Sequence, residues 1–433
     1  MITTPGIILL VLVLSVFIAM ARRKIGPELG MPILALFSLT LTDMHHAQDA
    51  LMSGFGEFAH IAFMFTAVAI AAAQMKKAKG LYWIGLAAGQ LVGKVKLSWG
   101  IPLWVSVPTV CLSMTWGMAA VVHNSTSILI MAAIITTICE QYSLRALPIL
   151  NGALVASNLG GFSSSWGDTP NIIEAQIWKL TQGDFGQILV INLGCLTILI
   201  AVVALLMKSD EQSLANVQVA SQLLAQARRQ TSVVGRYMAL GIFGVLAVVV
   251  LPIIWPDWAM QIVAGSMVAM ILILRVLERP DRRHNVFEAL GFETYVMLAA
   301  VFVLAAALSS DAMGISAMLS AWLKDTHASV WSVCFISYLG TLFTEAASWA
   351  NAASSIVYQF DTTHRAAWAL GGGICAGSSS LVTAASAGIL LLKQTEQNPT
   401  ESRVTFASYW KFGICFSLLM LLYYTIVLNL FTV

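Results

Sequence analysis

Hydrophobic runs dominate the chain, and many are long enough to cross a bilayer as a helix, which takes roughly 20 apolar residues. Uninterrupted runs cover residues 5–21, 31–49, 57–75, 186–207, 232–254, 257–277, 290–310 and 405–431. Three longer regions, 99–140, 145–179 and 328–393, are apolar but contain polar interruptions. The pattern predicts an all-α polytopic membrane protein in which some of the membrane helices are broken.

The most informative interruption lies between Asn151 and Glu174, in the sequence NGALVASNLGGFSSSWGDTPNIIE. Paired glycines, a serine run and a proline do not continue a helix well. Backbone released from a helix inside a bilayer must be buried in protein or line a wet cavity. We therefore expect a membrane helix broken over Gly160–Asn171, with its freed carbonyls and hydroxyls facing something polar. The alternative is a polar loop outside the membrane.

Composition agrees with this class of protein. Of the 433 residues, 58% are hydrophobic and 10% are charged, whereas a soluble domain carries about 25% charged residues. The basic residues are scattered over short loops, which gives no indication of a nucleic-acid partner. The six cysteines lie mostly in apolar runs without paired spacing, so we expect packing residues and neither disulfides nor a metal site. Arg22–Lys24 follow the first apolar run, which is therefore expected to be a retained helix and not a cleaved signal.

The distribution of Lys and Arg predicts how the chain is threaded. Suppose that 99–140 is a re-entrant hairpin from the cytoplasm, 145–179 a broken crossing, 328–361 a hairpin from outside and 366–393 a second broken crossing. Only Lys179, Lys324 and Arg365 of the 23 Lys and Arg then lie outside, as the positive-inside rule requires. This threading has about eleven crossings, with the N- and C-termini both outside.

The polar segment Ser209–Thr231 divides the chain into two halves and is expected to be a cytoplasmic linker with some helical character. Each half runs through an apolar span, an amphipathic segment, a hairpin, a broken helix and a final span. Because equivalent elements enter from opposite sides, the order predicts the inverted repeat found in many secondary transporters.

The candidate binding residues lie in four polar islands within the apolar runs, one in each of the two predicted hairpins and one in each of the two predicted broken helices. Helix ends at a break offer N–H donors to an anion, and carbonyl, Ser, Thr and Asn oxygens suit an alkali cation. The solute-binding candidates are His123, Asn124, Ser125, Thr126, Ser164, Ser348, Asn351, Ser378 and Ser379. The candidates for an ion, with sodium as the only metal considered, are Asn124, Ser125, Gly160, Gly161, Asp168, Asn171, Ser348, Ser380 and Thr383.

Several of these residues have a structural interpretation as well. Asp168 could counter a cation or carry a proton, since intramembrane carboxylates are functional by default, or it could cap the helix that resumes at Pro170. Glu345 could likewise pair with a cap or a serine. His123 is open to a hydrogen-bonding role at the hairpin tip or to a proton or solute role, and Trp349 to simple packing.

At these islands the chain resembles the ion transporter superfamily, which contains divalent-anion/sodium symporters and arsenite and sodium/proton antiporters. Ser157–Gly161 followed by Gly167–Asn171 is similar to its signature of Ser-Asn, a hydrophobic residue and Gly-Gly, then Gly-Asp-Pro-Pro-Asn. Asn124-Ser125 and Thr344-Glu345 resemble parts of its two hairpin motifs. His123, Trp349 and Asp168 depart from the dicarboxylate carriers, which puts a dicarboxylate substrate in doubt.

The resemblance implies a homodimer with elevator-type alternating access. It further implies a scaffold domain formed by residues 1–97 and 232–325, a transport domain formed by 98–207 and 326–433, and the linker 208–231 between the two halves. We therefore predict a secondary transporter of the inner membrane, without a cofactor, that moves a small anionic solute coupled to sodium or protons. The alternatives are a sodium/proton antiporter with Asp168 as proton carrier, an intramembrane enzyme using Ser163–Ser165 with His123, and a channel.

Overall fold

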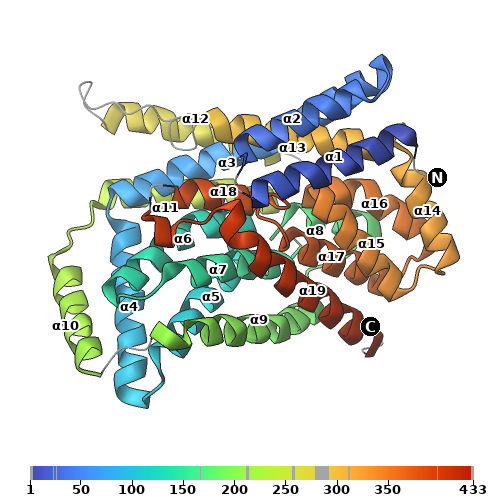
Figure 1. The fold of residues 1–433 in the computed structure, drawn as a ribbon. Helices are drawn as coiled ribbons and strands as arrows, with labels where there is room; N and C mark the ends of the chain where they lie inside the picture. Colours follow the sequence, from blue (N-terminus) through green and yellow to red (C-terminus); the bar gives the residue numbers. More distant parts are fainter. Residues whose placement is uncertain are drawn as a thin grey trace.

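The computed structural model describes residues 3–22, 24–25, 27–165, 167–210, 214–255, 259–277, 292–310, 313–396 and 398–430. Within these ranges every regular element is a helix (Figure 1). The first half contains α1 (Thr4–Ala21), α2 (Pro27–Thr40), α3 (Met44–Lys77), α4 (Gly80–Trp99), α5 (Leu103–Val122), α6 (Asn124–Gln141), α7 (Ala146–Gly161), α8 (Thr169–Trp178) and α9 (Phe185–Met207), followed by the 3-10 turn η1 (Lys208–Asp210) and α10 (Leu214–Gln230). The prediction of an all-α protein is confirmed for this part of the chain.

The second half repeats much of this order. It contains α11 (Gly235–Ile254), α12 (Ala259–Leu277), α13 (Phe292–Ser309), α14 (Ile315–Asp325), α15 (Val330–Phe343), α16 (Ala346–Phe360), α17 (His364–Ser378), α18 (Ser386–Thr395), the 3-10 turn η6 (Thr400–Ser402) and α19 (Phe406–Leu430). The starts of the spans predicted at 257–277 and 290–310 lie outside the described residues.

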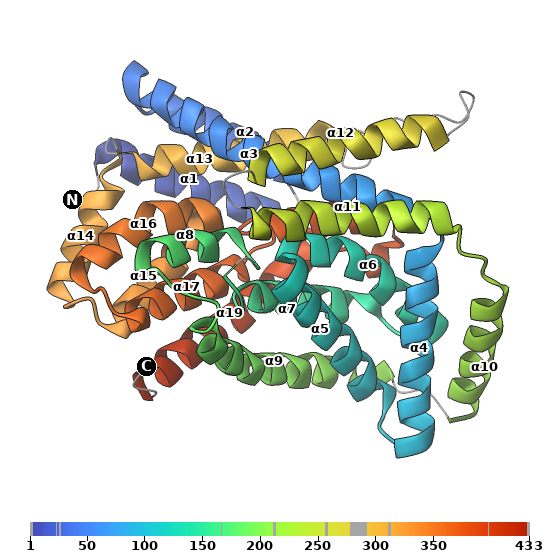
Figure 2. The same ribbon diagram turned by 180° about the vertical axis from the view of Figure 1, so that it is seen from behind.

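Most of the helices fall into two groups. Helices α2, α3, α11, α12 and α13 pack on one another and form a layer along one side (Figures 1 and 2). Helices α5 to α9 and α15 to α19 form the larger group on the other side of this layer. The predicted scaffold and transport domains, with their boundaries, stay a prediction.

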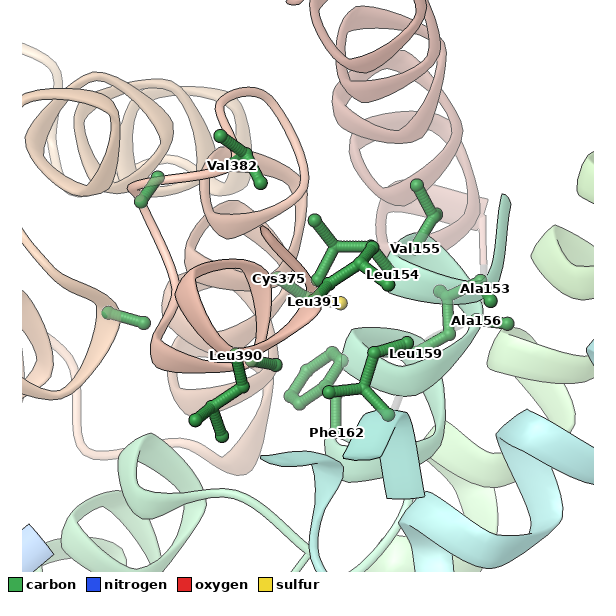
Figure 3. Close-up of a cluster of buried hydrophobic side chains, with 14 of the residues drawn as sticks. Ala153, Leu154, Val155, Ala156, Leu159, Phe162, Cys375, Val382, Leu390 and Leu391 are labelled. Atoms are coloured by element: carbon green, nitrogen blue, oxygen red, sulfur yellow. The ribbon is translucent and has the colours of Figure 1, made fainter. Parts of the chain in front are cut away.

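The larger group has a core to which both halves contribute. Leu154, Leu159 and Phe162 on and after α7 point toward the same space as Cys375 of α17 and Leu390 of α18, as Figure 3 shows, and all five are buried. Helix α18 also packs on α6, and α17 packs on α19. The two halves of the chain are therefore packed together at the level of the helix breaks.

Large apolar side chains also cover much of the outer surface. Val190 and Leu205 on α9 and Leu422 on α19 are more than half exposed, an arrangement that suits a lipid environment better than water. By length and composition, the described helices Leu103–Val121, Phe185–Met207 and Phe406–Leu430 could each cross a membrane, and the bent pair Asn216–Gln230 and Gly235–Val248 could add a fourth. The eleven crossings and the outside location of both termini stay predictions.

The first spans differ from those that the hydrophobic pattern predicted. Apolar runs at 31–49 and 57–75 suggested two helices separated near residue 50. Instead α2 ends at Thr40, and α3 runs without interruption from Met44 to Lys77. The reason is local: the Asp43 side chain accepts a hydrogen bond from the His46 amide and starts α3 earlier than hydrophobicity alone indicates. The linker is helical as predicted and packs, as α10, against α4.

Candidate functional site

The first predicted hairpin is present as α5 and α6, which are joined through the single residue His123. His123 has a φ of 93°, a region that side-chain-bearing residues rarely occupy and that costs about 1–3 kcal/mol. Its Nδ1 accepts a hydrogen bond from the Ser125 amide at 3.4 Å, so His123 has the hydrogen-bonding role considered for it. The Asn124 backbone amide donates to the Gly167 carbonyl at 2.9 Å. Thr126 is buried in the next turn. Because α5 is long enough to cross a bilayer alone, the re-entrant topology of this hairpin stays a prediction.

The first break separates α7, which ends at Gly161, from α8, which starts at Thr169. The Asn171 side-chain amide donates to the Gly161 and Ser164 carbonyls, each at 2.7 Å. The Ser164 hydroxyl donates to the Ala120 carbonyl of α5 at 2.7 Å. One asparagine thus satisfies two of the carbonyls that the break releases, and a serine ties the break to the hairpin.

Asp168 is the N-cap of α8, since its carboxylate accepts a hydrogen bond from the Thr169 amide at 2.9 Å. Asp168 also lies at the hairpin tip, because the preceding residue Gly167 accepts the Asn124 backbone hydrogen bond and the Asp168 and Asn124 Cβ atoms both lie against Gly161. The capping interpretation of Asp168 is therefore confirmed. A role in proton or cation binding remains open beside it, because the same carboxylate lies at the hairpin tip.

The second break lies between α17, which ends at Ser378, and α18, which begins at Ser386. The Ser378 and Ser379 hydroxyls donate to the Cys375 carbonyl at 3.0 and 2.8 Å, and the Ser380 hydroxyl donates to the Gly377 carbonyl. The Tyr409 hydroxyl donates to the Ser379 carbonyl at 2.6 Å. Thr383 is different: its hydroxyl oxygen is buried and has no hydrogen-bond partner. A buried oxygen of this kind is free to coordinate an ion.

Direct hydrogen bonds join the two halves at these breaks. The Asn158 side-chain amide of α7 donates to the Ser379 hydroxyl at 3.2 Å, and the hydroxyls of Ser125 and Ser386 lie 3.2 Å apart. The Asn124 side-chain amide also donates to the Asn158 side-chain oxygen at 3.5 Å. We call these residues the polar junction: Asn124, Ser125, Asn158, Ser379 and Ser386. The junction brings together the first hairpin tip and both breaks, all of them buried.

Asn158 and Ser386 were not among the candidate ligands predicted from the sequence. Both belong to polar stretches that the sequence singles out, Ser157–Gly161 and Gly377–Gly388. The hydrophobic pattern does not show which polar side chain near a helix end contacts a segment that is distant in the sequence. Asn158 and Ser386 are identified only by the three-dimensional contacts between the first half of the chain and the second break.

Gly160 and Gly161 have different surroundings although they are adjacent. A Cβ on Gly160 would lie 2.8 Å from the Ala119 Cβ and 2.9 Å from the Trp116 carbonyl carbon of α5. A Cβ on Gly161 would lie 3.2 Å from the Asn124 Cβ and 3.1 Å from the Asp168 Cβ. Gly161 therefore faces the hairpin tip and the break, whereas Gly160 allows α7 to approach the α5 backbone closely.

The second hairpin consists of α15 and α16 and turns at Thr344-Glu345. Glu345 is buried and caps α16, because its Oε2 accepts hydrogen bonds from the Ala347 and Ser348 amides at 2.8 and 3.3 Å. Trp349 is also buried, with its indole ring against Gly340 of α15. Glu345 therefore has a structural role as the N-cap itself, in contact with the Ser348 amide, and the packing interpretation of Trp349 is confirmed.

Ser348 and Asn351 face a different space from the polar junction. They line a cavity of about 410 Å³ between α16, the start of α3 and the end of α13. Its other polar lining residues are His45, His46, Asp49, Ser53 and Ser310. Two ion pairs border it, His45 Nδ1 to Asp49 Oδ2 at 2.9 Å and His46 Nδ1 to Asp43 Oδ2 at 2.7 Å. Hydrogen bonds from the backbone and ring of His46 hold the pKa of the exposed Asp43 below its usual value.

Helices broken at buried polar islands, inside a chain with an apolar exterior, define a polytopic membrane protein of the transporter class. Comparison with known sequences makes the assignment specific. The profile of the citrate transporter family matches residues 2–373, and the chain belongs to this family, in agreement with the ion transporter superfamily that its motifs indicate. Over 414 residues it is 25% identical to the magnetosome protein MamN of Magnetospirillum gryphiswaldense, covering 90% of this chain and 88% of that protein.

Two mycobacterial proteins are also similar. A 46 kDa membrane protein of Mycobacterium leprae is 25% identical over 336 residues, or 73% of this chain and 74% of that protein. An uncharacterized transporter of Mycobacterium tuberculosis is 33% identical over 88 residues, or 20% of each chain. The family and these names agree with a membrane transporter.

Proposed function

We propose that this chain is a secondary active transporter that carries a small carboxylate-bearing anion, with citrate as the first candidate, across the inner membrane. The observation that carries the proposal is the polar junction, where the first hairpin tip and both helix breaks meet through buried Asn and Ser side chains. The family description supplies the solute class. Sodium or protons provide the driving force.

The junction residues have the chemistry that such a carrier needs. Amide N–H groups and hydroxyls of Asn124, Ser125 and Asn158 can donate to carboxylate oxygens, and helix ends at the breaks add partial positive charge. The Thr383 hydroxyl, which has no partner, can join released carbonyls around a sodium ion. Ser348 and Asn351 line the separate cavity beside His45 and His46, where their side chains can hydrogen-bond a solute before it enters the transport domain.

The larger architecture proposed is that of an elevator transporter. In this architecture the chain crosses the membrane about eleven times with both termini outside, and the protein is a homodimer. In each protomer the two re-entrant hairpins and the two broken helices, related as an inverted repeat, belong to a mobile transport domain. The packing of α18 on α6 across the two halves supports movement of these elements as one body.

Purified protein in proteoliposomes is expected to accumulate radiolabelled citrate when a sodium or proton gradient is imposed, and Asn124→Ala is expected to lower the initial rate at least about tenfold. Glu140→Gln, at an exposed position at the end of α6, is the control and should transport normally. A thermal-shift series with citrate, malate and phosphate, with and without sodium, ranks the ligands independently. Normal uptake by Asn124→Ala would remove the junction as the binding site.

Sodium/proton antiport with Asp168 as proton carrier is the second candidate, favoured by the position of this carboxylate at the hairpin tip beside Asn124. Asp168→Asn keeps a side-chain oxygen able to cap α8, so folding stability should change by less than about 0.5 kcal/mol, whereas Asp168→Ala should cost about 1 kcal/mol. Antiport predicts proton release on addition of sodium without any organic anion, and its loss in Asp168→Asn. Proton release that persists in this variant would contradict it.

An intramembrane hydrolase built on His123 and Ser163 has less support. The Ser163 hydroxyl donates to the Leu159 carbonyl at 2.7 Å, and His123 Nδ1 accepts from the Ser125 amide. Both groups are thus engaged with other partners, whereas a nucleophilic serine needs its hydroxyl directed at the base.

A further inference from the structure

Glu174 is a carboxylate buried in the larger helix group without a partner. It lies on α8, one turn after Asn171, and its side chain is 0% exposed. Among the residues that the structure describes, neither Oε1 nor Oε2 of Glu174 has a hydrogen-bond partner, and no basic side chain forms an ion pair with it. Buried carboxylates in proteins are normally paired or hydrogen-bonded, so Glu174 requires an explanation.

The space around Glu174 is shaped for its side chain and is largely apolar. Gly371 of α17 makes room, since a Cβ at that position would lie 2.7 Å from Glu174 Oε2 and would also meet the Phe162 ring. Phe162 stacks edge-on with Trp368 and Tyr424, at centroid distances of 6.5 and 5.8 Å. In Figure 3 Phe162 points into the same buried cluster as Cys375. These surroundings exclude bulk water and offer an ionised carboxylate no compensation.

The titratable groups on the packed elements leave Glu174 without a counter-charge. Those that interact with it electrostatically are the Asp168 carboxyl and the Cys375 thiol, and neither is a cation. The remaining ones on or capping α8, on or capping α16 and α17, which pack against α8, and on α19, which packs against α17, are Lys179, Glu345, Tyr358, Asp361, His364, Arg365, Tyr409, Lys411, Cys415, Tyr423 and Tyr424. His364 pairs with Asp184, the Arg365 guanidinium donates to Asn429, and Lys179 is exposed.

We propose that Glu174 is a proton-binding site inside the membrane, and that the proton it holds is the coupling ion of the carrier. A proton removes the charge by forming one O–H bond on the carboxylate and needs no other ligand. A transition-metal ion would need several His, Cys, Asp or Glu ligands, and no group of three or more of these among the described residues could hold one. The coupling step rests on the proposed transport function, but the protonation of Glu174 does not.

The position of Glu174 on α8 explains how its proton would affect the solute site. Asn171, one turn earlier on the same helix, holds the Gly161 and Ser164 carbonyls of the first break. Gly167, just before the start of the helix, accepts a hydrogen bond from the Asn124 backbone amide of the polar junction at 2.9 Å. Loss of the proton would leave an uncompensated charge beside Phe162 and would favour a position of α8 in which Glu174 meets water. Movement of α8 would carry the break with it, so that proton release and solute release occur together.

The first experiment measures the protonation state directly, whether or not the chain transports citrate. Infrared spectra of purified protein at neutral pH are compared for the wild type, Glu174→Gln and the exposed control Glu140→Gln. We expect a carboxylic-acid C=O band, shifted as in apolar surroundings, in the wild type and in Glu140→Gln but not in Glu174→Gln. An unchanged carboxylic-acid spectrum in folded Glu174→Gln would overturn the proposal. If Glu174→Gln does not fold, isotope-edited spectra of wild-type protein labelled at glutamate replace it, and a fully ionised glutamate signal overturns the proposal.

The second experiment tests coupling, with a pH-sensitive dye inside proteoliposomes. With the wild type we expect the addition of citrate to move protons across the membrane. With Glu174→Gln we expect the exchange of labelled for unlabelled citrate to continue, whereas proton movement should fall to the level of empty vesicles. Proton movement equal to that of the wild type in Glu174→Gln would refute Glu174 as the coupling site. Absence of citrate exchange in the wild type would refute the proposed solute and leave the infrared result as the test of Glu174.

Discussion

Replacing Asn171 with alanine is expected to abolish transport and to lower the free energy of unfolding by about 3 kcal/mol, because each buried carbonyl left without a donor costs about 1–3 kcal/mol. The Asn171 amide donates to both the Gly161 and Ser164 carbonyls, and Asn171 itself is 1% exposed. Its loss would leave the Gly161 carbonyl without this donor, and the Ser164 carbonyl would keep only the longer bond from the Gly167 amide at 3.4 Å. Without it the break between α7 and α8 loses its closure, and the junction loses its geometry. Denaturant or thermal unfolding in detergent, together with citrate uptake in proteoliposomes, measures both effects.

The matched control for Asn171→Ala is Gln176→Ala, which removes an exposed side-chain amide from the same helix, α8. Exposed substitutions of this kind change stability by about 0.5 kcal/mol or less, and transport should be normal. Asn171→Asp separates the two roles of the amide, because a carboxylate cannot donate to either carbonyl. Should Asn171→Ala unfold and transport like the wild type, the break would not depend on this side chain, and the proposed site would have to be reassigned.

The helix breaks could be predicted from sequence because their residues have strong local preferences. Gly160-Gly161, the serine run and Pro170 cannot continue a helix, and the structure ends α7 at Gly161 and restarts at Thr169. The same holds for Gly377–Ser380 at the end of α17. Such effects act within one or two turns, so no tertiary information is needed.

The identity of the contacting residues could not be predicted in the same way. The bond between Asn158 and Ser379 joins residues more than two hundred positions apart, and helical periodicity gives no register between such distant helices. Ser348 and Asn351 were predicted to be ligands beside Ser379, but they line the separate cavity against α3 and α13. The start of α3 was misjudged because the Asp43 cap overrides hydropathy at that point.

Glu174 is a residue whose burial, and therefore whose importance, could not be predicted from the sequence. A single glutamate near the end of an apolar run, five residues before Lys179, is compatible with a membrane boundary, where charge is inexpensive. Its importance depends on complete burial beside Phe162 and Gly371, which is a property of packing. Polar composition identifies a site when several residues cluster, but it does not identify one carboxylate among apolar neighbours.

Gly160→Ala is expected to prevent correct folding, with a loss of more than about 3 kcal/mol in the free energy of unfolding, as overpacked buried positions lose typically 1–3 kcal/mol and occasionally more. The added methyl would meet the Trp116 carbonyl oxygen and lie 2.8 Å from the Ala119 Cβ. Because the obstacle is mainly backbone, no side-chain rotation can relieve it, and α7 would have to move away from α5. Yield of monodisperse protein and thermal unfolding in detergent test this directly.

Two nearby glycines separate packing from binding. Gly117→Ala on α5 adds a methyl where no atom lies within 4 Å and should be neutral or stabilise by up to about 1 kcal/mol. Gly161→Ala places its methyl 3.0–3.2 Å from Gly167, Asp168 and Asn124, so the protein should fold while citrate binding weakens. Stability of Gly160→Ala equal to that of Gly117→Ala would show that α5 and α7 do not approach as closely as described. Loss of folding in Gly160→Ala, with loss of binding alone in Gly161→Ala, would mean that adjacent residues of one motif serve helix packing and solute recognition separately.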